Sequence, residues 1–120
     1  MSKKILIVDD AAFMRMMIKD ILTKNGFEVV GEAADGVQAV EKYNELRPDL
    51  VTMDITMPNK DGLQALEEIL GFDPDAKIVM CTAIDENERM IKAIEIGAIE
   101  YLVKPINEIA LIQLLKLVLN

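Results

Sequence analysis

The sequence predicts an α/β fold in which an open parallel sheet carries helices on both faces. Short apolar runs alternate along the chain with segments whose apolar residues recur every three or four positions. The links between these segments are short, as they are between successive βα units. The chain has 120 residues, a length that suits one hydrophobic core. We therefore expect a single domain over residues 1–120.

Five short runs rich in aliphatic residues are the expected strands. Residues 5–8 are apolar throughout, which is typical of a strand covered on both faces. Right-handed crossovers between parallel strands leave few ways to order such runs in one sheet. The expected strands are residues 4–8, 27–33, 50–53, 77–81 and 100–103.

Five amphipathic segments follow these strands and are the expected helices. In the first, Phe13, Met17 and Ile21 are spaced by four and should share the apolar face. Asn25 and Gly26 form a stop signal at its end. The expected helical segments are residues 11–26, 35–49, 61–72, 86–98 and 107–120.

Composition excludes several classes of function. The chain carries 13 basic and 21 acidic residues, a net charge of −8, which disfavours nucleic acid and anionic membranes as partners. It contains no histidine, so Ser-His-Asp catalysis and histidine metal sites are excluded. Cys81 is the only cysteine, and no apolar run is long enough to span a membrane. These features predict a cytoplasmic protein.

Charged and polar residues follow four of the five expected strands. Asp9 and Asp10 follow the first strand, Asp54 the third, Thr82 the fourth and Lys104 the fifth. Because the carboxyl ends of parallel strands meet at one edge of a sheet, these side chains should lie together. Carboxylates in such proximity repel one another unless a proton or a divalent cation neutralises them.

Magnesium suits this edge because it prefers a few oxygen ligands and retains water. The expected ligands are Asp10, Asp54 and a nearby carbonyl such as that of Thr56, with Asp9 helping to hold the ion. Lys104 can pair with the Asp54 carboxylate and then with a phosphoryl group. The Thr82 hydroxyl and the backbone N–H of Ala83 can donate hydrogen bonds to phosphoryl oxygens. A carboxylate nucleophile in these surroundings indicates phosphoryl transfer to Asp54.

Several motifs resemble those of the response-regulator receiver domain. They are ILIVDDAAFMR, TMDITMP followed by DG at 61–62, CTA, and EYLVKP, and they occur in the family's order over essentially the whole chain. The resemblance implies a flavodoxin-like, doubly wound sheet of five strands in the order 2-1-3-4-5, with five helices. It implies that Asp54 is the phosphoacceptor. It also implies that Asp9, Asp10, Asp54 and the Thr56 carbonyl bind Mg²⁺.

The resemblance assigns further roles near the same edge. Thr82 is similar to the switch hydroxyl and Lys104 to the phosphoryl-binding lysine. Tyr101 is similar to the aromatic residue that turns inward on activation. Lys104 and Pro105 match a cis peptide bond of the family.

Thr56 and Ile84 occupy the positions that flank the path of the hydrolytic water in this family. Ile84 offers that water no hydrogen bond, which predicts slow self-dephosphorylation. A structural alternative is that Ile84 packs on the fourth helix.

The resemblance also implies the partners. The phosphoryl donor would be a phosphohistidine on a separate histidine kinase. The motifs are most similar to those of stand-alone chemotaxis receivers, so the expected output is control of the flagellar motor switch. Binding would use the face formed by the fourth helix, fifth strand and fifth helix. Such a protein catalyses only its own phosphorylation and dephosphorylation and is not otherwise an enzyme.

The last helix departs from an ordinary amphipathic pattern. Its apolar residues cannot all lie on one stripe, and they are Ile109, Leu111, Ile112, Leu114, Leu115, Leu117, Val118 and Leu119. One interpretation is a wide core face, and the other is an interface for a partner or a second copy.

Three other functions share parts of this pattern. A flavodoxin-like carrier should have a Ser-, Thr- and Gly-rich loop after the first strand, whereas this chain has two acids there. A haloacid-dehalogenase-type phosphatase should carry its nucleophile after the first strand rather than at Asp54. A phosphorelay intermediate would share every site residue and is not separated by the sequence.

Overall fold

The computed structural model describes residues 2–120 and shows one parallel sheet in the order β2-β1-β3-β4-β5. The strands are β1 Lys4–Val8, β2 Glu28–Ala33, β3 Leu50–Asp54, β4 Ile78–Thr82 and β5 Glu100–Val103. The helices are α1 Ala12–Lys24, α2 Gly36–Leu46, α3 Gly62–Phe72, α4 Asn87–Ile96 and α5 Glu108–Val118. The strand order and the five helices confirm the fold expected from the sequence.

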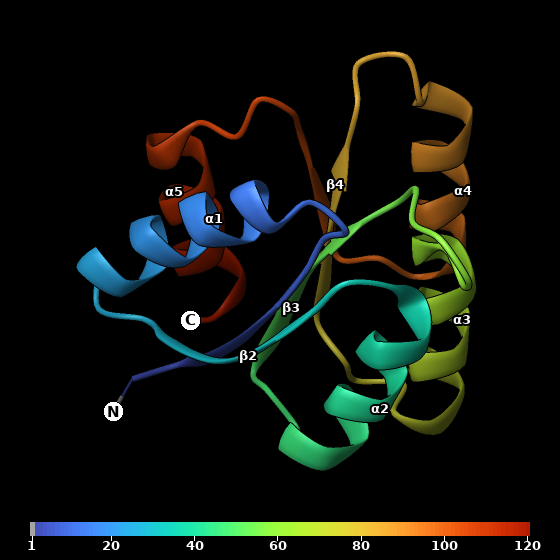
Figure 1. The fold of residues 1–120 in the computed structure, drawn as a ribbon, viewed down its shortest axis with the longest axis horizontal. Helices are drawn as coiled ribbons and strands as arrows, with labels where there is room; N and C mark the ends of the chain where they lie inside the picture. The colour runs from blue at the N-terminus through green and yellow to red at the C-terminus, as the bar shows by residue number, and fades with distance from the viewer. Residues whose placement is uncertain (1) are drawn as a thin grey trace.

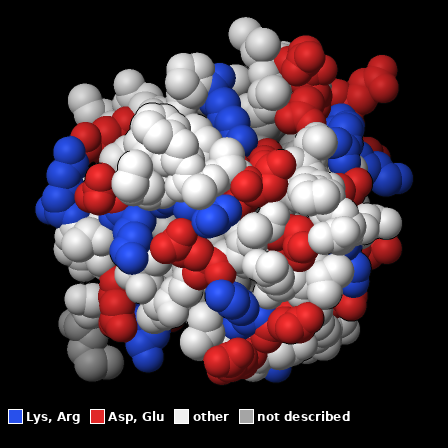
Figure 2. All heavy atoms as spheres, viewed as in Figure 1, with Lys and Arg blue, Asp and Glu red and all other residues white. Residues whose placement is uncertain are grey.

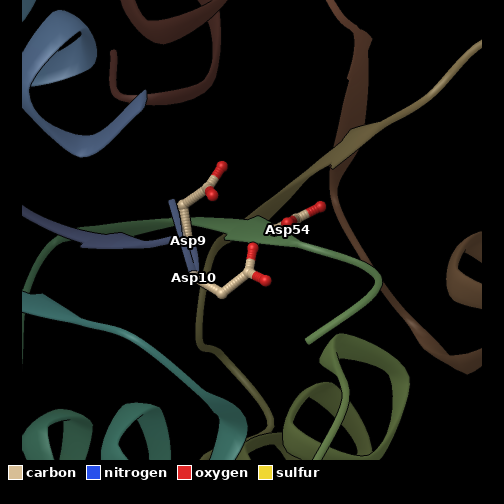
Figure 3. A group of neighbouring side chains, drawn as sticks. All are labelled: Asp9, Asp10 and Asp54. Carbon is tan, nitrogen blue, oxygen red and sulfur yellow. The ribbon is translucent and has the colours of Figure 1, made fainter. Parts of the chain in front are cut away.

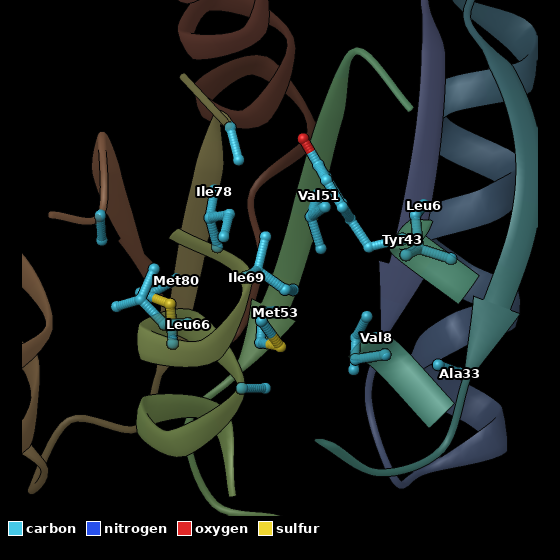
Figure 4. Packing of buried hydrophobic residues seen from close by; sticks show 14 of the residues in the cluster. Leu6, Val8, Ala33, Tyr43, Val51, Met53, Leu66, Ile69, Ile78 and Met80 are labelled. Atoms are coloured by element: carbon cyan, nitrogen blue, oxygen red, sulfur yellow. The ribbon is translucent and has the colours of Figure 1, made fainter. Parts of the chain in front are cut away.

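Helices cover both faces of the sheet (Figure 1). On one face, α1 and α5 pack against alternate strand residues such as Ile5, Ile7 and Val79. On the other, α2, α3 and α4 cover a second cluster that includes Leu6 and Met53 (Figure 4). Each fully buried aliphatic side chain contributes roughly 1.5–3 kcal/mol to folding, so the two clusters hold the layers together.

The expected apolar face of α1 was partly wrong. Phe13 is 68% exposed, whereas Ile18, Ile21 and Leu22 are buried. A spacing of four rotates a residue by about 40° around the helix at each step, because a turn contains about 3.6 residues. The series that starts at Phe13 is therefore exposed at its first member, partly buried at Met17 and buried at Ile21.

Residues beyond the core also differ in burial. Ile84 is 81% exposed, so the alternative in which it packs on α4 is wrong. In α5, Leu111 and Leu115 are buried while Ile109 and Leu117 are 67% and 72% exposed. The last helix therefore combines a core face with exposed apolar side chains.

Within the described part of the chain, no helix has the length and apolar character needed to cross a membrane.

The strand register places the ends of β1, β3, β4 and β5 at one edge. Val8 pairs with Met53, and Asp54 pairs with Cys81. A glycine at 62 is required beside this edge, because a Cβ there would lie 2.1 Å from the Asp54 carbonyl oxygen. The Gly62 N–H donates to the Ile55 carbonyl at 2.7 Å. This close approach lets the loop after β3 turn back over the site.

Candidate functional site

Three carboxylates lie together at the carboxyl ends of β1 and β3 (Figure 3). Each of Asp9, Asp10 and Asp54 offers an oxygen that lies within 4.8 Å of the other two. Asp9 and Asp54 are buried, with 1% and 6% exposure, whereas Asp10 is exposed. Oxygen ligands with one open side are the donor set that Mg²⁺ favours, because the ion retains part of its water shell. The residues present therefore fit this ion.

Asp9 is held by its neighbours in a fixed orientation. Its Oδ1 accepts a hydrogen bond from the Ala11 N–H at 2.8 Å. The Arg15 guanidinium donates to the Asp9 carbonyl at 2.7 Å and pairs with Glu32 at 3.1 Å. The sequence reasoning missed Arg15 and Glu32, since only the parallel pairing of β1 with β2 brings the end of β2 beside α1.

Lys104 lies between two of the acids. Its Nζ is 3.0 Å from Asp9 Oδ2 and 3.3 Å from Asp54 Oδ1. Burial alone would lower the pKa of Lys104, but the two carboxylates outweigh it and raise the pKa above its ordinary value. The Lys104 N–H donates to the Thr82 carbonyl at 2.8 Å, and the Lys104–Pro105 peptide bond is cis. The ammonium group is thus fixed beside Asp54 by the end of β5.

Asp54 binds a proton more tightly than an ordinary aspartate. Burial and the neighbouring Asp9 charge raise its pKa to about 6, while Lys104 opposes this rise and Asp10 adds to it. A buried acid whose neighbours include two more acids gains from any positive charge that arrives beside it. This property favours both a divalent cation and the pairing with Lys104.

The remaining expected residues lie around this cluster in different environments. Thr82 is buried at the end of β4, and its hydroxyl donates to the Ala83 carbonyl at 3.2 Å. Tyr101 lies on β5, where its backbone pairs in register with Met80. Its side chain is 38% exposed and therefore lies at the surface. Burial raises the pKa of the Cys81 thiol to about 12, which agrees with inert packing.

A second group of charged side chains connects the loop after β3 to the start of α4. Arg89 pairs with Asp61 at 2.8 Å and with Glu86 at 3.5 Å. The Thr56 hydroxyl donates to the Glu86 carboxylate, and Glu86 accepts from the Ala83 N–H at 2.9 Å. These contacts lower the pKa of Glu86 although burial alone would raise it. The sequence offered no periodicity or motif for them.

Comparison with known proteins decides the family. The model of the response regulator receiver domain matches residues 5–116. The chain belongs to the response regulator receiver domain family. Over 120 residues it is 58% identical to the chemotaxis protein CheY of Bacillus subtilis, with all of both chains covered. It is 59% identical to CheY of Thermotoga maritima over 105 residues, 88% of each chain.

Solved structures agree with this receiver assignment. The response regulator domain of Thermotoga maritima CheB superposes with a TM-score of 0.92 and 37% identity, covering 100% of this chain and 98% of that one. A CheX-CheY-BeF3-Mg complex from Borrelia burgdorferi gives a TM-score of 0.92 at 34% identity, with 98% and 90% coverage. Receiver domains are signalling proteins that bind Mg²⁺ at an acidic pocket. Membership of this family disfavours the flavodoxin-like and phosphatase alternatives.

The pKa of Asp54 predicts how stability depends on pH in metal-free buffer. The folded-state pKa of about 6 lies above the ordinary value of 3.8, so the folded protein binds this proton more tightly than the unfolded chain does. The resulting stability is fully present below about pH 3.8 and is lost as the pH rises through about 6. Asp54→Asn has no such proton to lose. Its free energy of unfolding relative to that of the wild type should therefore increase by about 1–3 kcal/mol as the pH rises from 4 to 8.

Urea unfolding at a series of pH values with a chelator measures this difference. Asp75→Asn is the matched control, because Asp75 is an exposed acid on the link between α3 and β4. A gap between Asp54→Asn and the wild type that stays constant from pH 4 to pH 8 would contradict the raised pKa.

Proposed function

We propose that this receiver domain accepts a phosphoryl group on Asp54 from the phosphohistidine of a histidine kinase and then binds an output partner. The observation that supports the proposal most is the position of Asp54. It is the last residue of β3, it lies in the carboxylate cluster, and its Oδ1 is 3.3 Å from Lys104. In the transfer, an Asp54 oxygen forms a bond to phosphorus, and the phosphorus–nitrogen bond to the donor histidine breaks.

The other site residues would support this transfer through charge and hydrogen bonds. Asp9, Asp10, Asp54 and the Thr56 carbonyl would hold Mg²⁺, which when bound supplies positive charge to the phosphoryl oxygens. Lys104 would move its pairing from the Asp54 carboxylate to the phosphoryl group, since its Nζ already lies between the acids. Thr82 would donate its hydroxyl to a phosphoryl oxygen. The protein would catalyse only its own phosphorylation and dephosphorylation.

The proposed output is control of the flagellar motor switch in chemotaxis, from a cytoplasmic location. The relatives named as chemotaxis proteins support this proposal. The face formed by α4, β5 and α5 carries exposed apolar side chains that could contact a partner, and Tyr101 would turn inward there on activation. They include Ile91, Ile94, Tyr101 and Val103. Mixing experiments with phosphotransfer domains would separate this role from that of a phosphorelay intermediate.

Acetyl phosphate should phosphorylate the protein on Asp54 when Mg²⁺ is present. Mass spectrometry should detect one added phosphoryl group, and fragmentation after borohydride trapping should locate it at position 54. The Asp54→Ala variant should gain no mass, because the nucleophilic carboxylate is absent. Modification of Asp9 or Asp10 in the wild type, or of none of the three acids, would contradict the proposed role.

The Ile84 side chain predicts a long-lived phosphorylated state. Ile84 is 81% exposed and offers no hydrogen bond to an attacking water, whereas a carboxylate at this position would. Self-dephosphorylation of Ile84→Glu should be several-fold faster, which is below the roughly 10²–10⁴-fold that a fully positioned proton-transfer group can contribute. Loss of label from the purified phosphoprotein measures the half-life, with Ile84→Leu as the apolar control. Equal half-lives in the Glu and Leu variants would refute the prediction.

The exposed apolar residues of α5 predict concentration-dependent self-association. Ile109 and Leu117 are largely exposed on this helix and would be buried against a second copy. Sedimentation velocity should show dimer at high protein concentration, and Leu117→Lys should shift the population to monomer. A wild-type monomer throughout the series, with and without a phosphoryl mimic, would rule out the dimer.

A further inference from the structure

The Glu86 carboxylate accepts hydrogen bonds from two donors on the loops that follow β3 and β4. Its Oε1 accepts from the Ala83 N–H at 2.9 Å, and its Oε2 accepts from the Thr56 hydroxyl. Ala83 directly follows β4, whose Cys81 pairs in register with Asp54. Thr56 lies two residues after Asp54 on the loop that follows β3. An anionic side chain is therefore bonded to both loops that leave the carboxyl ends of β3 and β4, at the edge of the sheet that carries Asp54.

Arg89 secures this carboxylate. One guanidinium nitrogen donates to the Thr56 hydroxyl oxygen and lies 3.5 Å from Glu86, while the other donates to Asp61 at 2.8 Å. Asp61 also caps α3 by accepting from the Gln64 N–H. We call the group of Thr56, Asp61, Glu86 and Arg89 the Glu86 clasp. The clasp ties the first turn of α4 to the loop between β3 and α3.

The surroundings make this arrangement sensitive to added negative charge. Acidic side chains gather over the connection from β4 to α4, at the upper right of Figure 2. Asp85, Glu86 and Glu88 all lie on this connection or in the first turn of α4. Arg89 lies in the same turn and pairs with Glu86. A phosphoryl group adds charge of about −1.5 to −2 at neutral pH, which would repel the Glu86 carboxylate and compete for the same donors.

We propose that Glu86 is an intramolecular competitor of the phosphoryl group, and that the clasp holds α4 in its unmodified position until a phosphoryl group displaces the carboxylate. This inference rests on the proposed function, because it requires an anion on Asp54. It gives the charged residues of the first turn of α4 a role in the site. It also connects Asp54 to the exposed Ile91 and Ile94, which lie on the same helix.

Beryllofluoride, a phosphoryl mimic, tests the competition at equilibrium. The affinity of the Mg²⁺-loaded protein for BeF3⁻ is measured by titration, followed by the amide resonance of Ala83. Glu86→Ala should bind BeF3⁻ about tenfold more tightly than the wild type, because a charge-assisted hydrogen bond no longer has to be displaced. Glu88→Ala is the matched control, since it removes the same charge from an exposed residue of the same turn. It should change the affinity less than about twofold by comparison.

Two further measurements separate competition from a structural role. Arg89→Ala frees Glu86 without removing it, so it should give a smaller gain in BeF3⁻ affinity than Glu86→Ala. In the absence of BeF3⁻ both variants should melt at a lower temperature than the wild type, because contacts within the clasp are lost. A merely structural role would lower both the melting temperature and the BeF3⁻ affinity.

The outcomes distinguish this inference from the function on which it rests. Equal BeF3⁻ affinities for Glu86→Ala, Glu88→Ala and the wild type would overturn the competition and leave the phosphoacceptor role standing. Absence of BeF3⁻ binding by all variants would instead overturn both. Binding by Glu86→Ala alone would support the clasp in its strongest form.

Discussion

Repulsion among the carboxylates of Asp9, Asp10 and Asp54 is the constraint on which the rest of the site depends. Two unit charges about 4 Å apart cost about 4 kcal/mol at an effective dielectric constant of about 20. Lys104 offsets part of this cost by lying between Asp9 and Asp54, and the raised pKa of Asp54 is what remains. Added positive charge therefore stabilises the site. A change of charge at Asp54 alters its electrostatic interactions with Asp9, Asp10 and Lys104.

The fold keeps these acids together despite their repulsion. Two apolar clusters pack on opposite faces of the central strands, between the sheet and the helices. The ends of β1 and β3 therefore cannot separate without exposing core residues. The absence of a side chain at Gly62 lets the loop after β3 approach the Asp54 backbone, and Asn59 donates to Asp35 at 2.8 Å to hold that loop against α2. Packing energy gained across the sheet thus sustains an electrostatic arrangement that is unfavourable by itself.

Short-range patterns predicted the strands, and one rule of sheet geometry predicted the acidic cluster, whereas the strand order was implied by the resemblance to receiver domains. The sequence placed Phe13 wrongly, since a spacing of four does not follow a straight stripe on a helix. It did not predict the contacts of Arg15 with Asp9 and Glu32, or those of Glu86 and Arg89 with the loop after β3. Such contacts join distant segments through long side chains, whose partners are fixed only by the packed structure.

Calorimetric titration with Mg²⁺ measures directly whether Asp9, Asp10 and Asp54 bind one ion together. The wild type should bind one ion per chain, and Asp10→Asn should lose affinity by about tenfold or more, with Asp75→Asn unchanged. Absence of binding heat across a titration that spans millimolar Mg²⁺, or equal affinity in Asp10→Asn and the wild type, would contradict a magnesium site shared by the three acids.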